Sequence, residues 1–289
     1  MRLVTMKFSA SQTTARVVDQ LCAGLRLPRK DLNLNEGVSL GPQDCLIAAF
    51  PVFSGRLPAF FQAWMNQIQG RNTPAVAVVV YGNRAYEDAL LELSDALSAA
   101  GFTVVGAAAV VAQHSIFPTV ANGRPDAADF AGIAHFARAL LEKGLDAAHP
   151  MISSIPGQRP YRKITALPLK PQTNSRCLRC GRCAVVCPVQ AIDPAQPHIT
   201  DKARCVSCTA CIHVCPAGAR QFPPVLYYPA QLDVYKRQVQ MACVNPASLA
   251  QVGNRKGRLA AGMDADLALF DKQWQCRGTL VEGRWVYRP

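Results

Sequence analysis

The stretches CLRCGRCAVVCP, residues 177–188, and CVSCTACIHVCP, residues 205–216, decide the fold of the region that contains them. Each has the spacing C-x2-C-x2-C-x3-C-P, in which three cysteines lie close together and a fourth follows before a proline. This is the spacing of bacterial [4Fe–4S] sites. Two tandem copies predict a small α+β region with two [4Fe–4S] clusters, bound by Cys177, Cys180, Cys183, Cys187, Cys205, Cys208, Cys211 and Cys215.

The two runs are expected to share their ligands. In two-cluster proteins with this spacing, the fourth cysteine of one run binds the cluster of the other run. We therefore predict one cluster on Cys177, Cys180, Cys183 and Cys215, and the other on Cys205, Cys208, Cys211 and Cys187. A pair of zinc sites is the alternative, because CxxC pairs also bind zinc. Zinc motifs usually separate two such pairs by a longer loop, which favours iron–sulfur clusters here.

Length and composition allow about two domains, because the chain has 289 residues and half of them are apolar. The longest apolar runs, 75–81 and 104–112, are far shorter than the roughly 18 residues of a membrane span and predict buried strands. The first residues are too short for a signal peptide, so we expect a cytoplasmic protein. Its twelve cysteines then indicate metal binding rather than disulfides. Four lie outside the runs and are interpreted as buried or incidental thiols: Cys22, Cys45, Cys243 and Cys276.

The formal charge of the chain is +12. An oxidised cluster with four thiolates carries about −2, so two clusters would lower the charge to about +8. The cluster region itself is basic, because Asp193 and Asp201 are outnumbered by Arg176, Arg179, Arg182, Lys202, Arg204 and Arg220. This excess indicates either an acidic redox partner protein or, more simply, counter-charge for anionic clusters and a solvated surface. No basic stripe with interleaved aromatics is present, so nucleic-acid binding is not expected.

Residues 1–150 alternate between two patterns. Apolar strand-like segments cover 2–8, 44–50, 75–81 and 103–112, and helical periodicity covers 15–25, 59–69, 87–100 and 126–143. Strands that alternate with helices of ten or more residues predict an α/β fold with a doubly wound parallel sheet. Ligands of such sheets bind at the carboxyl ends of the strands, near the topological switch point.

Three loops fall at these strand ends. Residues 9–14 are rich in hydroxyls and open a helix, where side chains and backbone N–H groups can bind phosphate. Residues 51–56 and 81–86 follow the next two strands. Serine and threonine are also ordinary helix caps, but the three loops together predict one mononucleotide site. The candidate binding residues are Ser9, Ser11, Thr13, Thr14, Phe53, Ser54, Gly55, Tyr81, Gly82, Asn83 and Tyr86.

The loop sequences are SASQTT at 9–14, PVFSGRLP at 51–58, VYGNRAYEDAL at 80–90 and HSI at 114–116. With them, the N-terminal part resembles a flavodoxin. Together with the cysteine runs, residues 1–222 resemble a family of anaerobe proteins that join a flavodoxin-like domain to a two-cluster ferredoxin domain. The resemblance implies a flavodoxin-like domain over 1–150, a linker over 151–170 and a 2[4Fe–4S] ferredoxin domain over 171–222, with FMN as a further cofactor.

Gln12 departs from the phosphate loop of that family, which commonly reads S-P-T-G-T-T. Glycine at this place accepts any φ, whereas Gln12 disfavours φ > 0. Either the loop stays in ordinary φ/ψ space or its phosphate affinity is reduced, and the domain either binds FMN or is an empty shell. Phe53 is a candidate to stack on the flavin ring or is a core residue. His114 receives no role.

The segment after Arg220 has a different pattern. The sequences NPA at 245–247, GRL at 257–259 and GMDADL at 262–267, with a strand-like segment at 285–288, resemble the C-terminal end of N-acetylglucosamine-6-phosphate deacetylase, an amidohydrolase. A (β/α)8 barrel takes roughly 250 residues, so the fragment 239–289 cannot build one and receives no catalytic role.

A junction is expected at 223–238. Its segment DVYKRQ, residues 233–238, is what one frame of a transposon-based sequencing adapter encodes. We hypothesise a chimeric join, and the alternative is a natural linker with a basic pair. A joined tail would expose surfaces evolved for another protein and is expected to be poorly ordered or prone to aggregation. Codons in the DNA that differ from the adapter would rule out the chimera.

These patterns together predict a soluble electron-transfer protein. It would pass single electrons through two [4Fe–4S] clusters, to or from FMN. No acid–base pair or nucleophile–base pair is visible, which favours a carrier over an enzyme with its own substrate. A flavin-dependent oxidoreductase that acts on an organic acceptor is the alternative, and a carbohydrate deacetylase is the less favoured one.

Overall fold

A computed structural model of the 289-residue chain describes residues 1–32, 37–148, 154–164, 168–271 and 275–288, without the side chains of 229 and 232–238. The chain forms two compact units, Met1–Pro224 and Val225–Pro289. The first unit contains a large parallel sheet and the region with the two cysteine runs. Among the described residues, no helix is both long and apolar enough to cross a membrane.

The first unit is built on a five-stranded sheet in which every neighbouring pair is parallel. Its order is β2 (Arg29–Asp31), β1 (Arg2–Lys7), β4 (Asp44–Pro51), β6 (Thr73–Tyr81) and β7 (Phe102–Val111). A separate parallel pair consists of β3 (Val38–Leu40) and β5 (Ile68–Gly70). Without this pair the strand order along the chain is 2-1-3-4-5, which is the flavodoxin-like order. The predicted doubly wound parallel sheet is confirmed.

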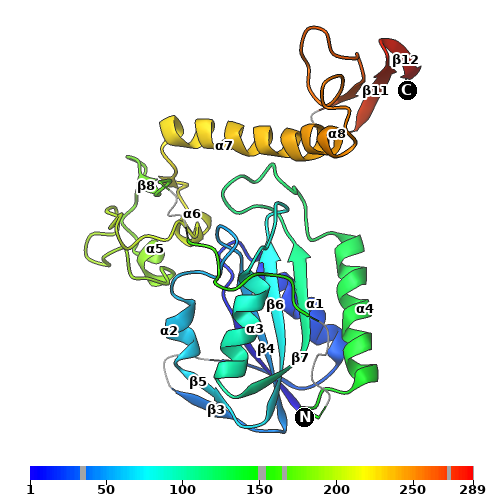
Figure 1. Cartoon of the computed structure of the whole chain (residues 1–289). Helices are drawn as coiled ribbons and strands as arrows, with labels where there is room; N and C mark the ends of the chain where they lie inside the picture. The colour runs from blue at the N-terminus through cyan, green and yellow to red at the C-terminus, as the bar shows by residue number, and fades with distance from the viewer. Residues whose placement is uncertain (33–36, 149–153, 165–167, 272–274, 289) are drawn as a thin grey trace. The chain divides into compact units, whose positions relative to one another are not determined.

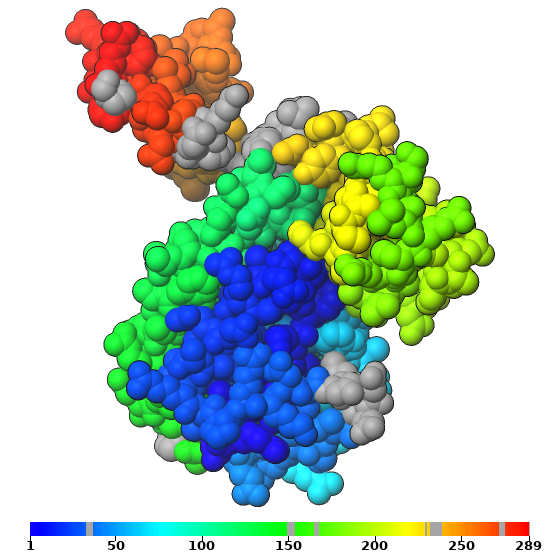
Figure 2. Space-filling view, turned by 180° about the vertical axis from the view of Figure 1, so that it is seen from behind, coloured from blue at the N-terminus to red at the C-terminus, as the bar shows by residue number. Residues whose placement is uncertain are grey.

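Helices cover both faces of the sheet (Figure 1). Helices α1 (Thr13–Leu25) and α4 (Ala127–Lys143) pack on one face, and their blue and green surfaces lie side by side in Figure 2. Helices α2 (Phe61–Met65) and α3 (Ala89–Ala99) pack on the other. Alternate residues of one strand face opposite layers, and for this reason the buried strands read as continuous apolar runs.

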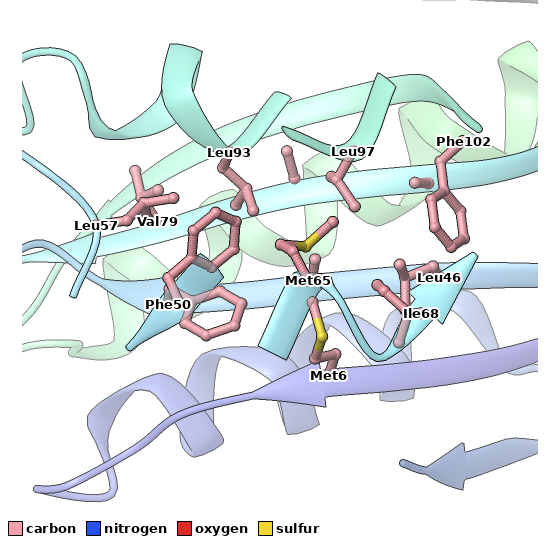
Figure 3. Packing of buried hydrophobic residues seen from close by; sticks show 14 of the residues in the cluster. Met6, Leu46, Phe50, Leu57, Met65, Ile68, Val79, Leu93, Leu97 and Phe102 are labelled. Carbon is pink, nitrogen blue, oxygen red and sulfur yellow. The ribbon is translucent and has the colours of Figure 1, made fainter. Parts of the chain in front are cut away.

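The layer beneath α2 and α3 is the larger of the two apolar cores (Figure 3). Phe50 is completely buried and contacts Phe61 edge-to-face, with 5.0 Å between ring centroids. Trp64 joins the same aromatic group at 5.7 Å from Phe50. Aromatic edge contacts of this kind add to the stabilisation from burial. This core fixes the carboxyl ends of β4 and β6, from which two of the predicted loops emerge.

The predicted helix over 59–69 is largely wrong. Only Phe61–Met65 is helical, and the chain then enters β5. The reason is a tertiary contact: the Gly70 N–H donates to the Ala100 carbonyl at 2.8 Å, and a Cβ on Gly70 would lie 2.6 Å from the Gly101 carbonyl oxygen. This close backbone approach requires an extended segment rather than a further helical turn.

Residues 154–164 of the predicted linker, which we call the connector, are bound along α3. The Asp88 carboxylate accepts the backbone N–H groups of Gln158 at 2.9 Å and Arg162 at 2.8 Å. Arg159 and Tyr161 both bind the Asp95 carboxylate. These contacts tie the connector to the sheet domain. Residues 151–153 and 165–167 of the predicted linker lie outside the described residues.

The cysteine-rich region is closed by β8 (Gln172–Thr173), which pairs antiparallel with β9 (Arg220–Gln221). Two short helices, α5 (Arg182–Val185) and α6 (Ala210–His213), follow each other at equivalent places in the two runs. The runs repeat every 28 residues, and so do their left-handed positions: Arg179 and Ser207, Gly181 and Thr209, Gln190 and Gly218. The region is therefore an internal duplication in backbone shape as well as in sequence.

The second unit contains α7 (Pro224–Val239), a π-helical turn (Gln240–Val244), α8 (Asn245–Leu249) and a three-stranded antiparallel sheet. The strands are β10 (Leu267–Phe270), β11 (Cys276–Val281) and β12 (Arg284–Tyr287). The hypothesised chimeric join, residues 233–238 of the expected junction, lies within α7. Leu249 and Leu259 are each 86% exposed, so this unit leaves large apolar side chains in solvent.

Candidate functional site

A cavity of about 1300 Å³, counting its part open to solvent, lies at the carboxyl ends of the parallel strands. We call it the strand-end cavity. The loops after β1, β4, β6 and β7 contribute to its wall. Six predicted residues line it: Ser11, Thr13, Phe53, Ser54, Tyr81 and Gly82. Its place beside β1 and β4 is the switch point at which doubly wound sheets bind ligands.

Five other predicted residues do not line the cavity. The Ser9 hydroxyl accepts the Ala15 N–H at 3.0 Å and so supports the start of α1. Thr14 is buried in the core, and Tyr86 packs edge-on against Tyr81 with 5.4 Å between ring centroids. Gly55 and Asn83 also lie outside the wall and take left-handed φ values of 82° and 59°. Phe53 both lines the cavity and packs on the core, so its two interpretations are compatible.

Gln12 adopts the left-handed conformation, with φ 64° and ψ −3°. The alternative in which the loop stays in ordinary φ/ψ space is therefore wrong. A side chain in this region costs roughly 1–2 kcal/mol relative to the right-handed region. The Gln12 side chain is exposed, and the neighbouring Ser11 and Thr13 hydroxyls lie 3.1 Å apart at the cavity. The loop thus keeps the backbone shape that glycine allows, at a cost to stability.

We expect Gln12→Gly to raise the free energy of unfolding by about 0.5 kcal/mol. Relief of the left-handed strain exceeds the extra chain entropy that glycine has in the unfolded state. The control is Gln20→Gly, the same change inside α1, which should lower stability by about 1 kcal/mol. Urea unfolding of the two variants measures both values. If both variants were destabilised equally, Gln12 would carry no strain.

His114, which has no role in the sequence-based prediction, lines the strand-end cavity. Its Nδ1 accepts the backbone N–H groups of Ile116 at 3.1 Å and Phe117 at 3.2 Å. Burial lowers the pKa of His114 to about 4, so the ring is neutral at pH 7 and carries its proton on Nε2. Gly82 is required beside it, because an added Cβ would lie 2.5 Å from the His114 Cδ2. The ring therefore offers an N–H donor of fixed tautomer.

The cysteine-rich region supplies the remaining wall of the strand-end cavity, through residues 203–207 and Lys170. The Lys170 ammonium donates to the Cys205 carbonyl at 2.5 Å, and the Ser207 hydroxyl donates to the Leu169 carbonyl at 2.6 Å. Val206 and Cys208 pack against the apolar core of the sheet domain. This part of the wall was not predictable from loop patterns, because it comes from chain about 190 residues beyond the phosphate loop.

Two smaller cavities of about 330 Å³ each, counting open space, lie within the cysteine-rich region. The first thiol cavity is lined by Cys177, Cys180, Cys183 and Cys215. The second thiol cavity is lined by Cys187, Cys205, Cys208 and Cys211. The structure thus brings together three cysteines of one run and the fourth cysteine of the other in each case. No group of three or more described His, Cys, Asp or Glu side chains is placed to hold a single metal ion.

Backbone N–H groups point at four of these sulfurs. Cys187 and Cys215 each accept the N–H of the residue four positions on, Ala191 and Ala219, at 3.2 Å. Cys177 and Cys205 each accept the N–H of the residue two positions on, at 3.4 and 3.5 Å. Hydrogen bonds to ligand sulfur stabilise the thiolate and raise the potential of a bound cluster. The left-handed residues of each repeat turn the backbone so that these N–H groups face sulfur.

The thiols differ in how readily they ionise. Burial raises the pKa of Cys208 to about 11 and that of Cys211 to about 12. Burial also acts to raise the pKa of Cys215, but backbone N–H groups outweigh it and leave that pKa below its usual value. Buried thiols with such high pKa values stay protonated at pH 7 unless a metal displaces the proton. The fit to iron–sulfur clusters rests instead on geometry, because four thiols surround each cavity and backbone N–H groups face four of the sulfurs.

A buried cation also fits an anionic group in the first thiol cavity. Arg220 is 3% exposed and lines this cavity, and its Nε has no hydrogen-bond partner. The ion pairs found among the described residues do not include Arg220. A buried, uncompensated guanidinium is costly, whereas a cluster with four thiolates carries a compensating negative charge of about −2.

Comparison with known proteins gives the following similarities. Residues 176–219 match the family of 4Fe-4S dicluster domains. No curated protein matches the chain. Among solved structures, a flavodoxin from the domain Archaea is 12% identical, covers 50% of this chain and 98% of its own, and has a TM-score of 0.36. Flavodoxin 2 from Bacillus cereus is 14% identical, covers 50% of this chain and 99% of its own, and has a TM-score of 0.39. Rubredoxin oxygen:oxidoreductase from the anaerobe Desulfovibrio gigas is 14% identical, covers 49% of this chain and 36% of its own, and has a TM-score of 0.32. The fold assignment rests on strand order, and the similarity of residues 176–219 to 4Fe-4S dicluster domains supports an iron–sulfur role for the cysteine-rich region.

Proposed function

We propose that the chain is an electron-transfer protein that moves single electrons through two [4Fe–4S] clusters and exchanges them with FMN. The observation that carries the proposal is the position of Cys205. This residue lines both the second thiol cavity and the strand-end cavity. Cys205 would thus bind a cluster and also form part of the wall around the FMN, within one compact unit.

Each cofactor has candidate residues. In each thiol cavity, three cysteines of one run and the fourth cysteine of the other would hold a cluster. The Ser11 and Thr13 hydroxyls, with the start of α1, would hold the FMN phosphate. Phe53 and Tyr81 offer aromatic surface to the flavin ring, and His114 offers one N–H. FMN supplies both hydride and one-electron chemistry. The residues of this chain would bind the groups and orient them.

Binding of FMN to the full chain tests the flavin part. We expect anaerobic titration to quench flavin fluorescence at one FMN per chain. The double variant Ser11→Ala/Thr13→Ala should weaken binding at least about a hundredfold, because each change removes a hydrogen bond to a charged phosphate worth about 1.5–3 kcal/mol. Ser39→Ala, on the exposed side of β3, is the control and should bind as the wild type does.

Two outcomes would count against this proposal. Unchanged FMN affinity in the double variant would remove the phosphate loop from the site. Steady turnover of a quinone by the purified chain with reduced nicotinamide would favour the flavin-dependent oxidoreductase instead. The second unit, Val225–Pro289, takes no part in the proposed function, and a deacetylase activity of the full chain would contradict that assignment.

A further inference from the structure

We infer that Arg220 makes the two thiol cavities electrostatically unequal, so that a cluster on Cys177, Cys180, Cys183 and Cys215 has the higher reduction potential. The inference rests on the proposed function, since it concerns the clusters that the cavities would hold. It goes further, because it assigns unequal roles to two sites whose sequence motifs are identical in spacing.

Arg220 lines the first thiol cavity and not the second, although it also contacts Thr200, a residue of the second cavity's wall. Its Nη2 lies 3.6 Å from the Cys183 sulfur, and its guanidinium also donates to the Pro197 carbonyl and the Thr200 hydroxyl. It is 3% exposed. These contacts hold the guanidinium in one place, and its partners are neutral. Its positive charge is therefore neither neutralised by a carboxylate nor screened by water.

The internal duplication identifies the residue at the second thiol cavity that is equivalent to Arg220. The 28-residue repeat that relates the two runs places Ile192 at the position of Arg220. Ile192 is 3% exposed and lines the second thiol cavity. Among the residues that the structure describes, no charged side chain lines that cavity, whereas Arg179 and Arg182 also line the first. Lys170, which binds the Cys205 carbonyl, lines the strand-end cavity and not the second thiol cavity.

The sign of the effect follows from charge. Reduction adds one negative charge to a cluster, and a nearby buried cation stabilises the more negative state. Burial strengthens this effect because the local dielectric constant is low. Arg179 and Arg182 are exposed and contribute less. The higher-potential cluster is then the one in the first thiol cavity. Cys205, which lines the strand-end cavity, does not line this cavity, and one of its cysteines, Cys180, is exposed.

The test is an anaerobic redox titration of the full holoprotein, followed by electron paramagnetic resonance. We expect two resolved one-electron steps in the wild type. Arg220→Met should lower the higher potential at least as much as a tenfold change in the one-electron equilibrium constant, which is 59 mV. Arg220→Lys should retain most of the separation. Lys202→Met, which removes an exposed charge that lines neither thiol cavity, is the matched control and should leave the separation of the two steps unchanged.

Assignment of the two steps uses a ligand variant. Cys180→Ser should shift the higher-potential step, because Cys180 lines the first thiol cavity. This titration shows which cluster has the higher potential even if Arg220→Met fails to assemble a cluster. Coincident steps in the wild type, or a shift of the lower step in Cys180→Ser, would overturn the inference. Equal potentials in a chain with about eight iron atoms would overturn this inference alone, whereas a chain without iron would overturn the proposed function.

Discussion

The double variant Cys187→Ala/Cys208→Ala is expected to keep about four of about eight iron atoms per chain. Both cysteines line the second thiol cavity, although they come from different runs. With crossed ligands, the two changes remove the same cluster and leave the other intact. If each run held its own cluster, the same variant would lose both clusters and nearly all of its iron. Iron and acid-labile sulfide analysis of the anaerobically purified protein measures the difference.

The complementary double variant reverses this expectation. Cys180→Ala/Cys187→Ala removes two cysteines of one run that line different cavities, so crossed ligation predicts the loss of both clusters. Cys243→Ala is the control, because Cys243 is exposed in the second unit and should not affect iron content. Half the iron in the complementary variant would contradict crossed ligation.

Acidification from pH 7 to pH 5 is expected to cost the N-terminal domain about 2 kcal/mol of stability through His114 alone. Burial lowers the pKa of His114 to about 4 in the folded state, whereas an unfolded histidine titrates near 6.5. Between these values the unfolded chain binds more protons than the folded chain. The contribution is therefore fully present above pH 6.5 and is lost as the pH falls towards 4.

Urea unfolding of the wild type and of His114→Asn, at pH 7 and pH 5, measures this contribution as a double difference. Asparagine can still accept a backbone N–H in this loop but does not titrate. His135→Asn, a change of an exposed histidine on α4, is the matched control and should keep the pH dependence of the wild type. An equal pH dependence in His114→Asn and the wild type would show that the buried ring does not cause it.

The sheet and the grouping of the cysteines were the features most accessible from sequence. Strand β6 is a run of small and β-branched apolar residues buried on both faces, which is typical of central parallel strands. The crossed grouping of Cys187 and Cys215 agrees with the two thiol cavities. Strand β2 was missed because its three residues are all exposed, and such a short polar edge has no periodic signal.

Other features depend on contacts between distant residues. Asp88 binds the connector at Gln158, 70 positions away, and nothing in either local sequence indicates this pairing. The part of the strand-end cavity that Cys205 lines also depends on contacts between residues far apart in the sequence. Arg220 looked like one of several surface cations in the sequence, and only the packing of its guanidinium beside Cys183 sets it apart. Gln12 adopts a left-handed conformation that its residue type disfavours, and the local sequence does not indicate this.

The most direct test of the central claim is cofactor analysis of the full chain after anaerobic purification. The measurement is iron, acid-labile sulfide, zinc and FMN per polypeptide. Two clusters on crossed cysteines and a flavin in the strand-end cavity predict about eight iron, about eight sulfide and one FMN, with no stoichiometric zinc. Zinc in place of iron would contradict the account.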